Sequence, residues 1–247
     1  MRSQKYAPIR CEGITKRFDD QLAVDDLSFE VHAGSITGFV GANGAGKTTT
    51  IRMLLGLIEP TSGQALVDGR PYVDHHAPRR VVGASVDGPG AHPSRTALDH
   101  LRIIATAGGL PLRWAGEALE LVGLAAHARQ KVGTFSMGML QRLALAGALL
   151  ADPPILILDE PVNGLDPGGI IWMRTLLRQL ADDGRAILVS SHLLAELAEI
   201  ADHVVIIDQG RLVADDALDN LLAGRSGSLE DLYFELVGSV PTEEVAP

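Results

Sequence analysis

The chain has 247 residues, of which 46% are hydrophobic and 21% charged, and its formal net charge is −10 at pH 7. This length allows one substantial core, or a core plus a subdomain. The negative charge argues against a broad nucleic-acid-binding face, because neutralising phosphates requires clustered Lys and Arg. A single cysteine, Cys11, excludes an internal disulfide framework and indicates a reducing compartment.

We expect neither a signal peptide nor a membrane-spanning segment. No apolar run follows the first residues, and the best spanning candidate, residues 143–151, ends at Asp152 and two prolines. The sequence therefore predicts a soluble, cytoplasmic protein that reaches any membrane through a partner.

The first part of the chain predicts strands and a phosphate-binding loop. Residues 9–18, 27–31 and 35–40 have strand character, and residues 50–55 have helical character. Between them, residues 41–49 read Gly-Ala-Asn-Gly-Ala-Gly-Lys-Thr-Thr, with two glycines separated by four residues and followed by Lys and Thr. The strand–loop–helix context is what this motif requires, so the chain is predicted to bind a nucleoside triphosphate.

Each residue type in this loop suits phosphate chemistry. The glycines let backbone N–H groups turn towards a phosphate, and the helix N-terminus adds its dipole. Lys47 can reach the outer phosphates, and the Thr48 hydroxyl can bind Mg²⁺. An accidental Gly-rich turn is the alternative, which the flanking strand and helix disfavour. The candidate nucleotide-binding residues of the loop are Gly41, Ala42, Asn43, Gly44, Ala45, Gly46, Lys47, Thr48 and Thr49.

The chain then changes from strands to helices. Residues 64–67, with a hairpin-type turn at Asp68-Gly69, and residues 80–86 are predicted to be strands. From residue 94 to residue 150, apolar side chains recur at helical spacing, so we interpret this region as a helical subdomain inserted in the sheet domain. Its polar residues Thr96, Asp99, Glu117 and Glu120 are expected on a solvated surface.

A second anion site is predicted in the helical region. Residues 134–142 open a helix running to Leu150, with Ser136 as a plausible N-cap and Gly138 leaving backbone exposed. Such a helix start can bind an anion. Because it lies in a separate subdomain, it could serve a nucleotide held by another copy of the protein.

Strand–helix alternation returns after Pro154. Residues 155–158 are a fully apolar strand, as expected in a parallel sheet covered on both faces. Asp159 and Glu160 follow at the strand end where open α/β sheets bind ligands. Asp159 is suited to hold Mg²⁺ through water, and Glu160 to polarise an attacking water. The alternative is a pair of acids that merely cap a strand.

The remaining elements complete the alternation. They are predicted as a helix over 168–180, a strand over 186–189, a helix over 193–200, strands over 204–207 and 212–213, a helix beginning at Ser228, and a loose tail over 240–247.

With these motifs in order, the chain resembles the ATP-binding cassette (ABC) ATPases, the nucleotide-binding subunits of ABC transporters, from about residue 9 to about residue 224. Residues 41–48 resemble the Walker A motif, and 155–160 resemble Walker B with its catalytic glutamate. The other matches are residues 135–139 to the signature (usually Leu-Ser-Gly-Gly-Gln), 164–166 to the D-loop, 190–192 to the switch-histidine loop, and Phe18 to an aromatic that stacks on adenine.

The resemblance implies an α/β fold with a P-loop NTPase core of mixed or parallel sheet and an N-terminal antiparallel β subdomain. The core comprises residues 1–86 and 151–224, and the helical signature subdomain about residues 87–150. Together these residues form a single ABC ATPase domain over 1–224. Residues 225–247 are expected to be a C-terminal helix and tail.

It also implies a head-to-tail dimer, with a second copy or a paralogous subunit, that holds ATP between the two chains. Lys47, Glu160 and His192 would be catalytic, with Ser136, Gly138 and Asp166 contributing to the composite ATP site. Mg²⁺ would be held by Thr48, Asp159 and Asp87. An integral membrane permease would place the protein at the inner face of the cell membrane, and no nucleic acid is expected.

Three departures from the family pattern involve four positions. Asp87 stands where Gln is usual, Met137 and Met139 stand in the signature where Gly and Gln are usual, and Ala42 stands where many members carry Pro. The acidic variant and residues 228–238 resemble the bacterial drug- and antibiotic-resistance exporters most.

Other phosphate-loop proteins remain as alternatives. A small-molecule kinase or GTPase would lack the signature and the switch histidine, and the chain has no Asn-Lys-x-Asp motif. A soluble cassette ATPase without a permease, such as an iron–sulfur-assembly type, is the stronger rival.

Overall fold

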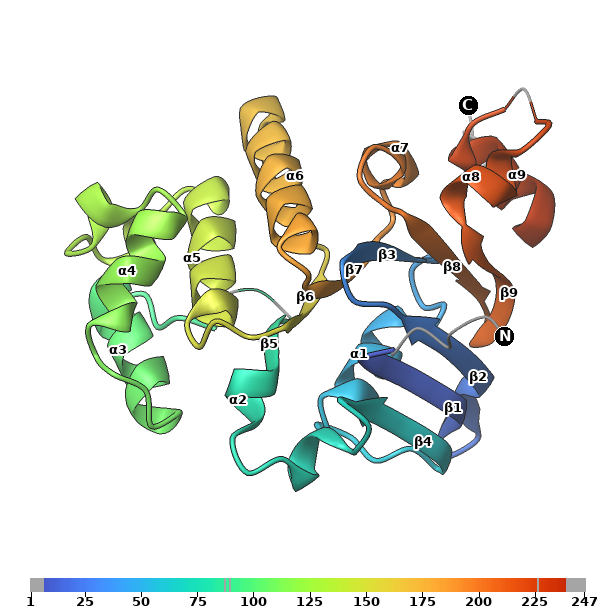
Figure 1. Cartoon of the computed structure of the whole chain (residues 1–247), viewed down its shortest axis with the longest axis horizontal. Helices are drawn as coiled ribbons and strands as arrows, with labels where there is room; N and C mark the ends of the chain where they lie inside the picture. The colour runs from blue at the N-terminus through green and yellow to red at the C-terminus, as the bar shows by residue number, and fades with distance from the viewer. Residues whose placement is uncertain (1–6, 87, 89, 226, 239–247) are drawn as a thin grey trace, which may run out of the picture.

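The computed structural model describes residues 7–86, 88, 90–225 and 227–238. The predicted Asp87 site and the predicted tail over 240–247 lie outside the described residues. Within these ranges the chain builds two sheets, flanked by helices (Figure 1).

The smaller sheet is antiparallel and comes almost entirely from the N-terminal part of the chain. Its strands are β1 (Ile9–Phe18), β2 (Gln21–Val31) and β4 (Ser62–Val67), in the order β2-β1-β4. β1 and β2 alternate buried and exposed residues over much of their length, so one face of this sheet packs inwards. The predicted antiparallel β unit at the N-terminus is confirmed.

The larger sheet has six strands in the order β5-β6-β7-β3-β8-β9, and only the pairing of β8 with β9 is antiparallel. β6 and β7 are apolar and almost wholly buried because helices or the other sheet cover both faces. The strands are β3 (Ser35–Val40), β5 (Val82–Ser85), β6 (Ile155–Asp159), β7 (Ala186–Ser191), β8 (His203–Asp208) and β9 (Arg211–Ala217).

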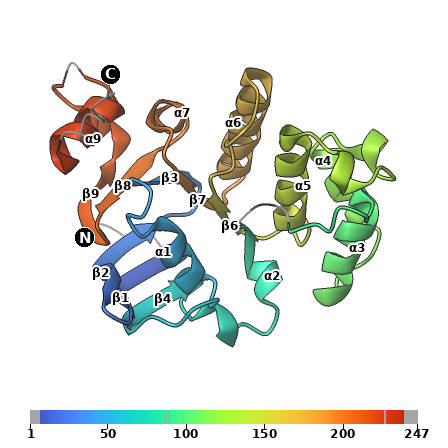
Figure 2. The same cartoon turned by 180° about the vertical axis from the view of Figure 1, so that it is seen from behind.

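The helices surround this sheet. They are α1 (Lys47–Leu54), α2 (Pro78–Val81), α3 (Ala97–Ala107), α4 (Trp114–Leu121), α5 (Met137–Leu149), α6 (Pro167–Asp182), α7 (Leu194–Ala198), α8 (Leu218–Leu222) and α9 (Leu229–Val237). Short 3₁₀ turns lie at Tyr72–Asp74, Ala125–His127 and Val132–Thr134. Figure 2 shows α3, α4 and α5 grouped at one end of the molecule and α8 and α9 at the other.

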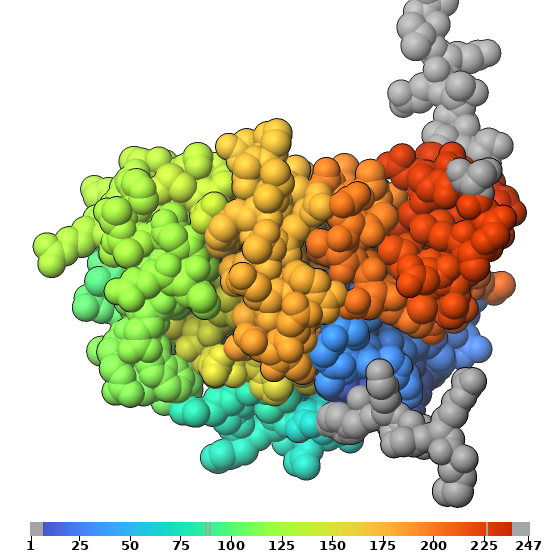
Figure 3. All heavy atoms as spheres, turned by 45° about the horizontal axis from the view of Figure 1, so that its top comes forward, coloured from blue at the N-terminus to red at the C-terminus, as the bar shows by residue number. Residues whose placement is uncertain are grey.

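Two apolar clusters fill the interior. One lies between the two sheets and around α1, and it includes Phe29 and Phe39, whose rings stack at 5.2 Å. The other joins the opposite face of the large sheet to α3–α7 and α9. In the space-filling view, α6 lies between the helical end and the C-terminal end of the visible face (Figure 3).

The mixed α/β architecture predicted from the sequence is confirmed, with two local corrections at its edges. Arg80 and Val81 belong to α2, not to a strand, because Pro78 stands in the first turn, where its fixed φ favours a helix start. The turn at Asp68-Gly69 does not lead into a second strand, because only the single bridge Val67–Arg70 follows it.

The polar surface predicted around α3 and α4 is partly structural. Glu117 and Glu120 are exposed as predicted. Thr96, however, is the N-cap of α3, because its hydroxyl accepts from the Asp99 N–H at 3.1 Å and donates to the Asp99 carboxylate at 2.7 Å. In the described part of the chain, no helix has the length and apolar character needed to cross a bilayer.

Candidate active site

The phosphate loop leaves the carboxyl end of β3 and enters α1 in a conformation that only glycine permits at two positions. A Cβ at Gly41 would lie 2.6 Å from the Ile207 carbonyl oxygen. Gly46 has φ of 105°, and its Cβ would lie 2.6 Å from the Ala23 oxygen. These close approaches explain the glycines at the two ends of the motif.

Lys47 is folded back onto the loop. Its side chain is only 7% exposed, and its ammonium donates to the carbonyl oxygens of Gly41 at 2.6 Å and of Ala42 at 3.2 Å. Burial lowers the pKa of Lys47 below 10.5, while Glu160 and Asp159 act to raise it. The loop therefore contains a buried cation held by neutral carbonyl groups, which suits it to an arriving anion.

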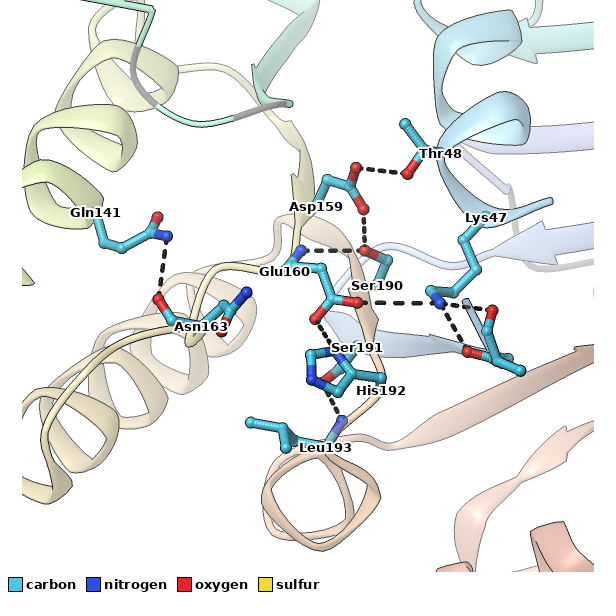
Figure 4. Close-up of polar contacts among 12 residues, drawn as sticks. Lys47, Thr48, Gln141, Asp159, Glu160, Asn163, Ser190, Ser191, His192 and Leu193 are labelled. Atoms are coloured by element: carbon cyan, nitrogen blue, oxygen red, sulfur yellow. Dashed lines mark hydrogen bonds and ion pairs between the residues drawn. The ribbon is translucent and has the colours of Figure 1, made fainter. Parts of the chain in front are cut away.

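Two hydroxyl groups hydrogen-bond to the Asp159 carboxylate at the end of β6. The Thr48 hydroxyl donates to Asp159 Oδ2 at 3.0 Å, and the Ser190 hydroxyl donates to the other Asp159 oxygen (Figure 4). Hard oxygen donors of this kind suit Mg²⁺, which commonly takes one or two protein ligands and completes its shell with phosphates and water. Thr48 and Asp159 therefore fit a metal site shared with a nucleotide.

Glu160 lies next to both Lys47 and His192. Its Oε2 is 2.7 Å from His192 Nδ1, and its Oε1 is 4.0 Å from Lys47 Nζ (Figure 4). Its backbone has φ of 51°, a left-handed conformation that is uncommon outside glycine. The Glu160 N–H donates to the Ser190 carbonyl at 3.2 Å and to its hydroxyl at 3.1 Å, so β7 holds the backbone of Glu160 in place.

A cleft of about 880 Å³, a size typical of small-molecule sites, opens beside Lys47, Thr48 and Glu160. Asp159 and His192 are not among its described lining residues. Phe18, predicted to stack on adenine, lines it and is 45% exposed, with Lys16 Nζ 5.1 Å from the ring centroid. Of the predicted loop residues, Gly41 and Ala45 are not among its lining. The described residues that line it are Phe18, Gln21, Leu22, Ala23, Asp25, Ala42, Asn43, Gly44, Gly46, Lys47, Thr48, Thr49, Glu160, Gln209 and Arg211.

Sequence reasoning missed the wall of the cleft that β2 and the β8–β9 turn supply. Arg211 pairs with Asp25 at 2.6 Å, and Gln209 lies beside it on the cleft. Neither belongs to a motif with a recognisable spacing. The signal that could have found them is the antiparallel hairpin of β8 and β9, because the turn between these strands lies beside the phosphate loop.

The signature residues lie elsewhere. Ser136 is the N-cap of α5, as predicted, accepting from the Met139 N–H at 3.2 Å, and Met137 is 55% exposed. A Cβ on Gly164 would lie 2.6 Å from Met137 Cγ, so this methionine packs on the predicted D-loop. The described structure brings neither Ser136 nor Gly138 to the lining of the cleft.

Asp166 has a structural role in its own chain. It is the N-cap of α6, and its carboxylate accepts from the Gly169 N–H at 2.7 Å. It does not line the cleft in the part of the chain that the structure describes. The predicted site residues therefore fall into two groups: the cleft group around Lys47 and the surface group of Ser136, Gly138 and Asp166.

Known proteins match the chain along most of its length. A family model described as ABC transporter matches residues 24–163. The bacitracin transport ATP-binding protein BcrA of Bacillus licheniformis is 46% identical over 86% of this chain and 71% of its own. The Nod factor export ATP-binding protein I of Burkholderia pseudomallei is 38% identical, over 98% of this chain and 81% of its own.

Solved structures of ABC transporter ATP-binding subunits also match this chain. The structure of an ATP binding subunit of an ABC transporter superposes with a TM-score of 0.83 at 31% identity, covering 92% of this chain and 98% of that one. The predicted motifs occur in order on this fold, with the phosphate loop between β3 and α1 and the acidic pair at the end of β6. The chain therefore belongs to the ABC transporter family, as an ATP-binding subunit that hydrolyses ATP.

Proposed function

We propose that this ATPase powers a membrane permease that exports an antibiotic-like compound. The permease, the direction and the class of cargo are supported by the similarity to ATP-binding proteins named for bacitracin transport and for Nod factor export. The observation that carries the proposed mechanism is the pair of contacts by which Glu160 joins Lys47 on one side and His192 on the other.

The loop residues 41–49 are proposed to hold the phosphates of ATP, with Phe18 against the adenine. Binding would draw Lys47 from the Gly41 and Ala42 carbonyls to the outer phosphates, a gain because a phosphate is a stronger acceptor than a neutral carbonyl. Thr48 and Asp159 would hold Mg²⁺, together with Asp87, and bound Mg²⁺ would neutralise phosphate charge.

Glu160 is proposed to orient and deprotonate the attacking water. Its side chain is 23% exposed, so water can reach it, and its Oε1 lies 4.0 Å from Lys47 Nζ. His192 Nδ1 is the ring nitrogen that contacts Glu160, so Nε2 is the one left for the terminal phosphate. To donate to both Glu160 and the phosphate, the imidazole must carry a proton on each nitrogen. The two side chains therefore act as one unit at the end of the nucleotide.

The surface group of Ser136, Gly138 and Asp166 is proposed to complete the site of an opposing subunit. These residues lie outside their own cleft, on the exposed start of α5 and the segment that leads into α6. Two copies, or this chain and a paralogous subunit, would place each surface group over the partner's cleft. ATP would then stabilise the dimer by differential binding, and hydrolysis would release it.

This assignment implies the organisation expected from the sequence. Residues 1–86 and 151–224 would be the ATP-binding core, about 87–150 the helical part that contacts the permease, and 225–247 a C-terminal extension. The permease would hold the protein at the inner face of the membrane.

The Glu160→Gln variant tests the catalytic assignment. It keeps the side-chain shape and removes the base, so ATP binding should persist while kcat falls by about 10²- to 10⁴-fold. ATP should also trap the variant as a dimer, seen by size-exclusion chromatography. The control is Glu120→Gln, an exposed residue on α4, which should leave turnover unchanged. Wild-type turnover in Glu160→Gln would refute the role of Glu160.

The permease assignment needs a separate measurement. The protein should co-purify with an integral membrane protein expressed beside it and should sediment with membranes. A protein that stays out of the membrane fraction under these conditions, while still hydrolysing ATP, would instead be a soluble cassette ATPase.

A further inference from the structure

The surface group is divided between two helix starts. Ser136 and Gly138 lie at the start of α5, whereas Asp166 is the N-cap of α6. Figures 1 and 2 both show α5 and α6 as neighbouring helices. A partner's nucleotide can meet both parts of the surface group at once only if the two helix starts keep a fixed relation to each other.

Arg142 of α5 and Trp172 of α6 form a stacked contact between these helices. The Arg142 Cζ atom lies 3.7 Å from the centroid of the Trp172 ring, which is van der Waals contact. Both side chains are half-buried, and Trp172 also packs against the large apolar cluster. A planar guanidinium on an indole face combines cation–π attraction with stacking, which an ammonium group cannot do.

The same guanidinium also holds α4. Arg142 Nη1 donates to the carbonyl oxygen of Val122, the C-cap of α4, at 2.9 Å, and a cation is favourable at a helix C-terminus. Gly123 follows with φ of 72°, and a Cβ there would lie 3.2 Å from Nη1, so the glycine leaves room for the guanidinium. Arg142 is therefore fixed on two sides, and it joins α4, α5 and α6.

Two smaller contacts link the same pair of segments. Gln141 Nε2 donates to the Asn163 carbonyl oxygen at 3.3 Å (Figure 4). Met137 packs on Gly164, as described above. Neither contact involves a charge or a ring. The stack is therefore the contact whose removal tests the connection between the two helix starts most directly.

We propose that Arg142 and Trp172 are positioning residues for the surface group: their stack fixes the start of α5 against the start of α6, so that the surface group meets the partner's nucleotide as one unit. This inference rests on the proposed composite site. Neither side chain lines the chain's own cleft in the part that the structure describes, so the stack acts on the opposing site through Ser136, Gly138 and Asp166. ATP that binds the aligned arrangement better also stabilises it.

The Trp172→Leu variant tests this, since it removes the ring and keeps an apolar side chain. The ATP Kd of the isolated subunit, measured without divalent cations, should stay at the wild-type value, because Trp172 does not line the cleft. ATP-dependent dimerisation is measured by analytical ultracentrifugation in a Glu160→Gln background, where hydrolysis does not deplete the dimer. There the dimer dissociation constant should rise about tenfold, since each of the two sites loses a cation–π contact that corresponds to about threefold. With Glu160 intact, kcat should fall while the ATP Kd is unchanged.

Trp114→Leu is the matched control. Trp114 is also half-buried, packs against the same apolar cluster and lies 5.5 Å from the guanidinium carbon of Arg80, but it is not between α5 and α6. This variant should lose thermal stability and still dimerise as its parent does. Arg142→Lys is a second test, because it keeps the charge and loses the planar group, so it should weaken dimerisation in the same way. In the Arg142→Lys background, Trp172→Leu should have no further effect.

Unchanged dimerisation in Trp172→Leu and Arg142→Lys would overturn the inference and leave the proposed composite site intact. An equal loss in Trp114→Leu would also overturn it, because general stability would then explain the effect. A Glu160→Gln parent that stays monomeric with ATP would instead contradict the proposed composite site.

Discussion

The two halves of the composite site differ in how they are held. Beside the phosphate loop, Lys47, Glu160 and His192 form a continuous set of contacts, and Lys47 is only 7% exposed. At the start of α5, Ser136 makes only a local capping bond, and Met137 is 55% exposed. The first half is preassembled inside one chain, whereas the second is presented to the surface.

This difference explains why only one half looks like an active site on its own. Buried charges must be paired or hydrogen-bonded, so the cleft residues find partners within the chain. The signature residues carry no charge and are satisfied by their helix start, so nothing forces them towards the cleft.

The largest expected effect comes from breaking the preassembled half. Lys47→Ala removes the cation that would contact the outer phosphates, and the loss of a charge-assisted hydrogen bond of about 3 kcal/mol predicts a rise in ATP Kd of about 100-fold. Isothermal titration calorimetry measures this directly. Lys131→Ala, at an exposed lysine of the helical region, controls for the change in net charge. Unchanged affinity in Lys47→Ala would contradict the role of the loop.

The preassembled half was also the easier one to predict. Its loop is contiguous in sequence, and Asp159 was linked to it, across 111 positions, by the rule that parallel strands present their carboxyl ends at one edge. Arg211 follows no such rule. It is a single residue on an edge strand, brought to the cleft by the packing of β9, which no local pattern encodes.

The predicted start of the strand over residues 80–86 was wrong for a similar reason. Arg80 and Val81 fit an apolar strand pattern, but Pro78 starts a single helical turn before β5 begins. A four-residue helix is too short for a periodic signal, so only the proline indicated it. The capped starts of α5 and α9 were predictable, because a cap is set by residues within four positions.

A smaller effect is expected from the surface half. Ser136→Ala should leave the ATP affinity of the isolated subunit unchanged, because Ser136 does not line its own cleft. It should lower steady-state ATPase activity by about tenfold, the factor that corresponds to one lost hydrogen bond of about 1.4 kcal/mol to the partner's nucleotide. ATP-dependent dimerisation should weaken with it.

Thr96→Ala is the matched control for Ser136→Ala, because both remove the N-cap of a helix in the same region. Each should cost about 1 kcal/mol of stability in urea unfolding. Only Ser136→Ala should lose ATPase activity. Equal activity losses in the two variants would mean that the signature serine acts through helix stability alone.

The smallest expected effect is on stability at high pH, and it tests how tightly the cleft holds Lys47. Burial lowers the pKa of Lys47 below 10.5, so between its folded and unfolded pKa values the unfolded chain binds more protons. The cost of burying the charge is then fully present at neutral pH and is relieved as the pH rises through the folded pKa towards 10.5. Relative to Lys47→Met, the wild-type free energy of unfolding without nucleotide should therefore increase as the pH rises towards 10.5. A constant difference between the two proteins would show that the carbonyls of Gly41 and Ala42, with Glu160, fully compensate the burial of this charge.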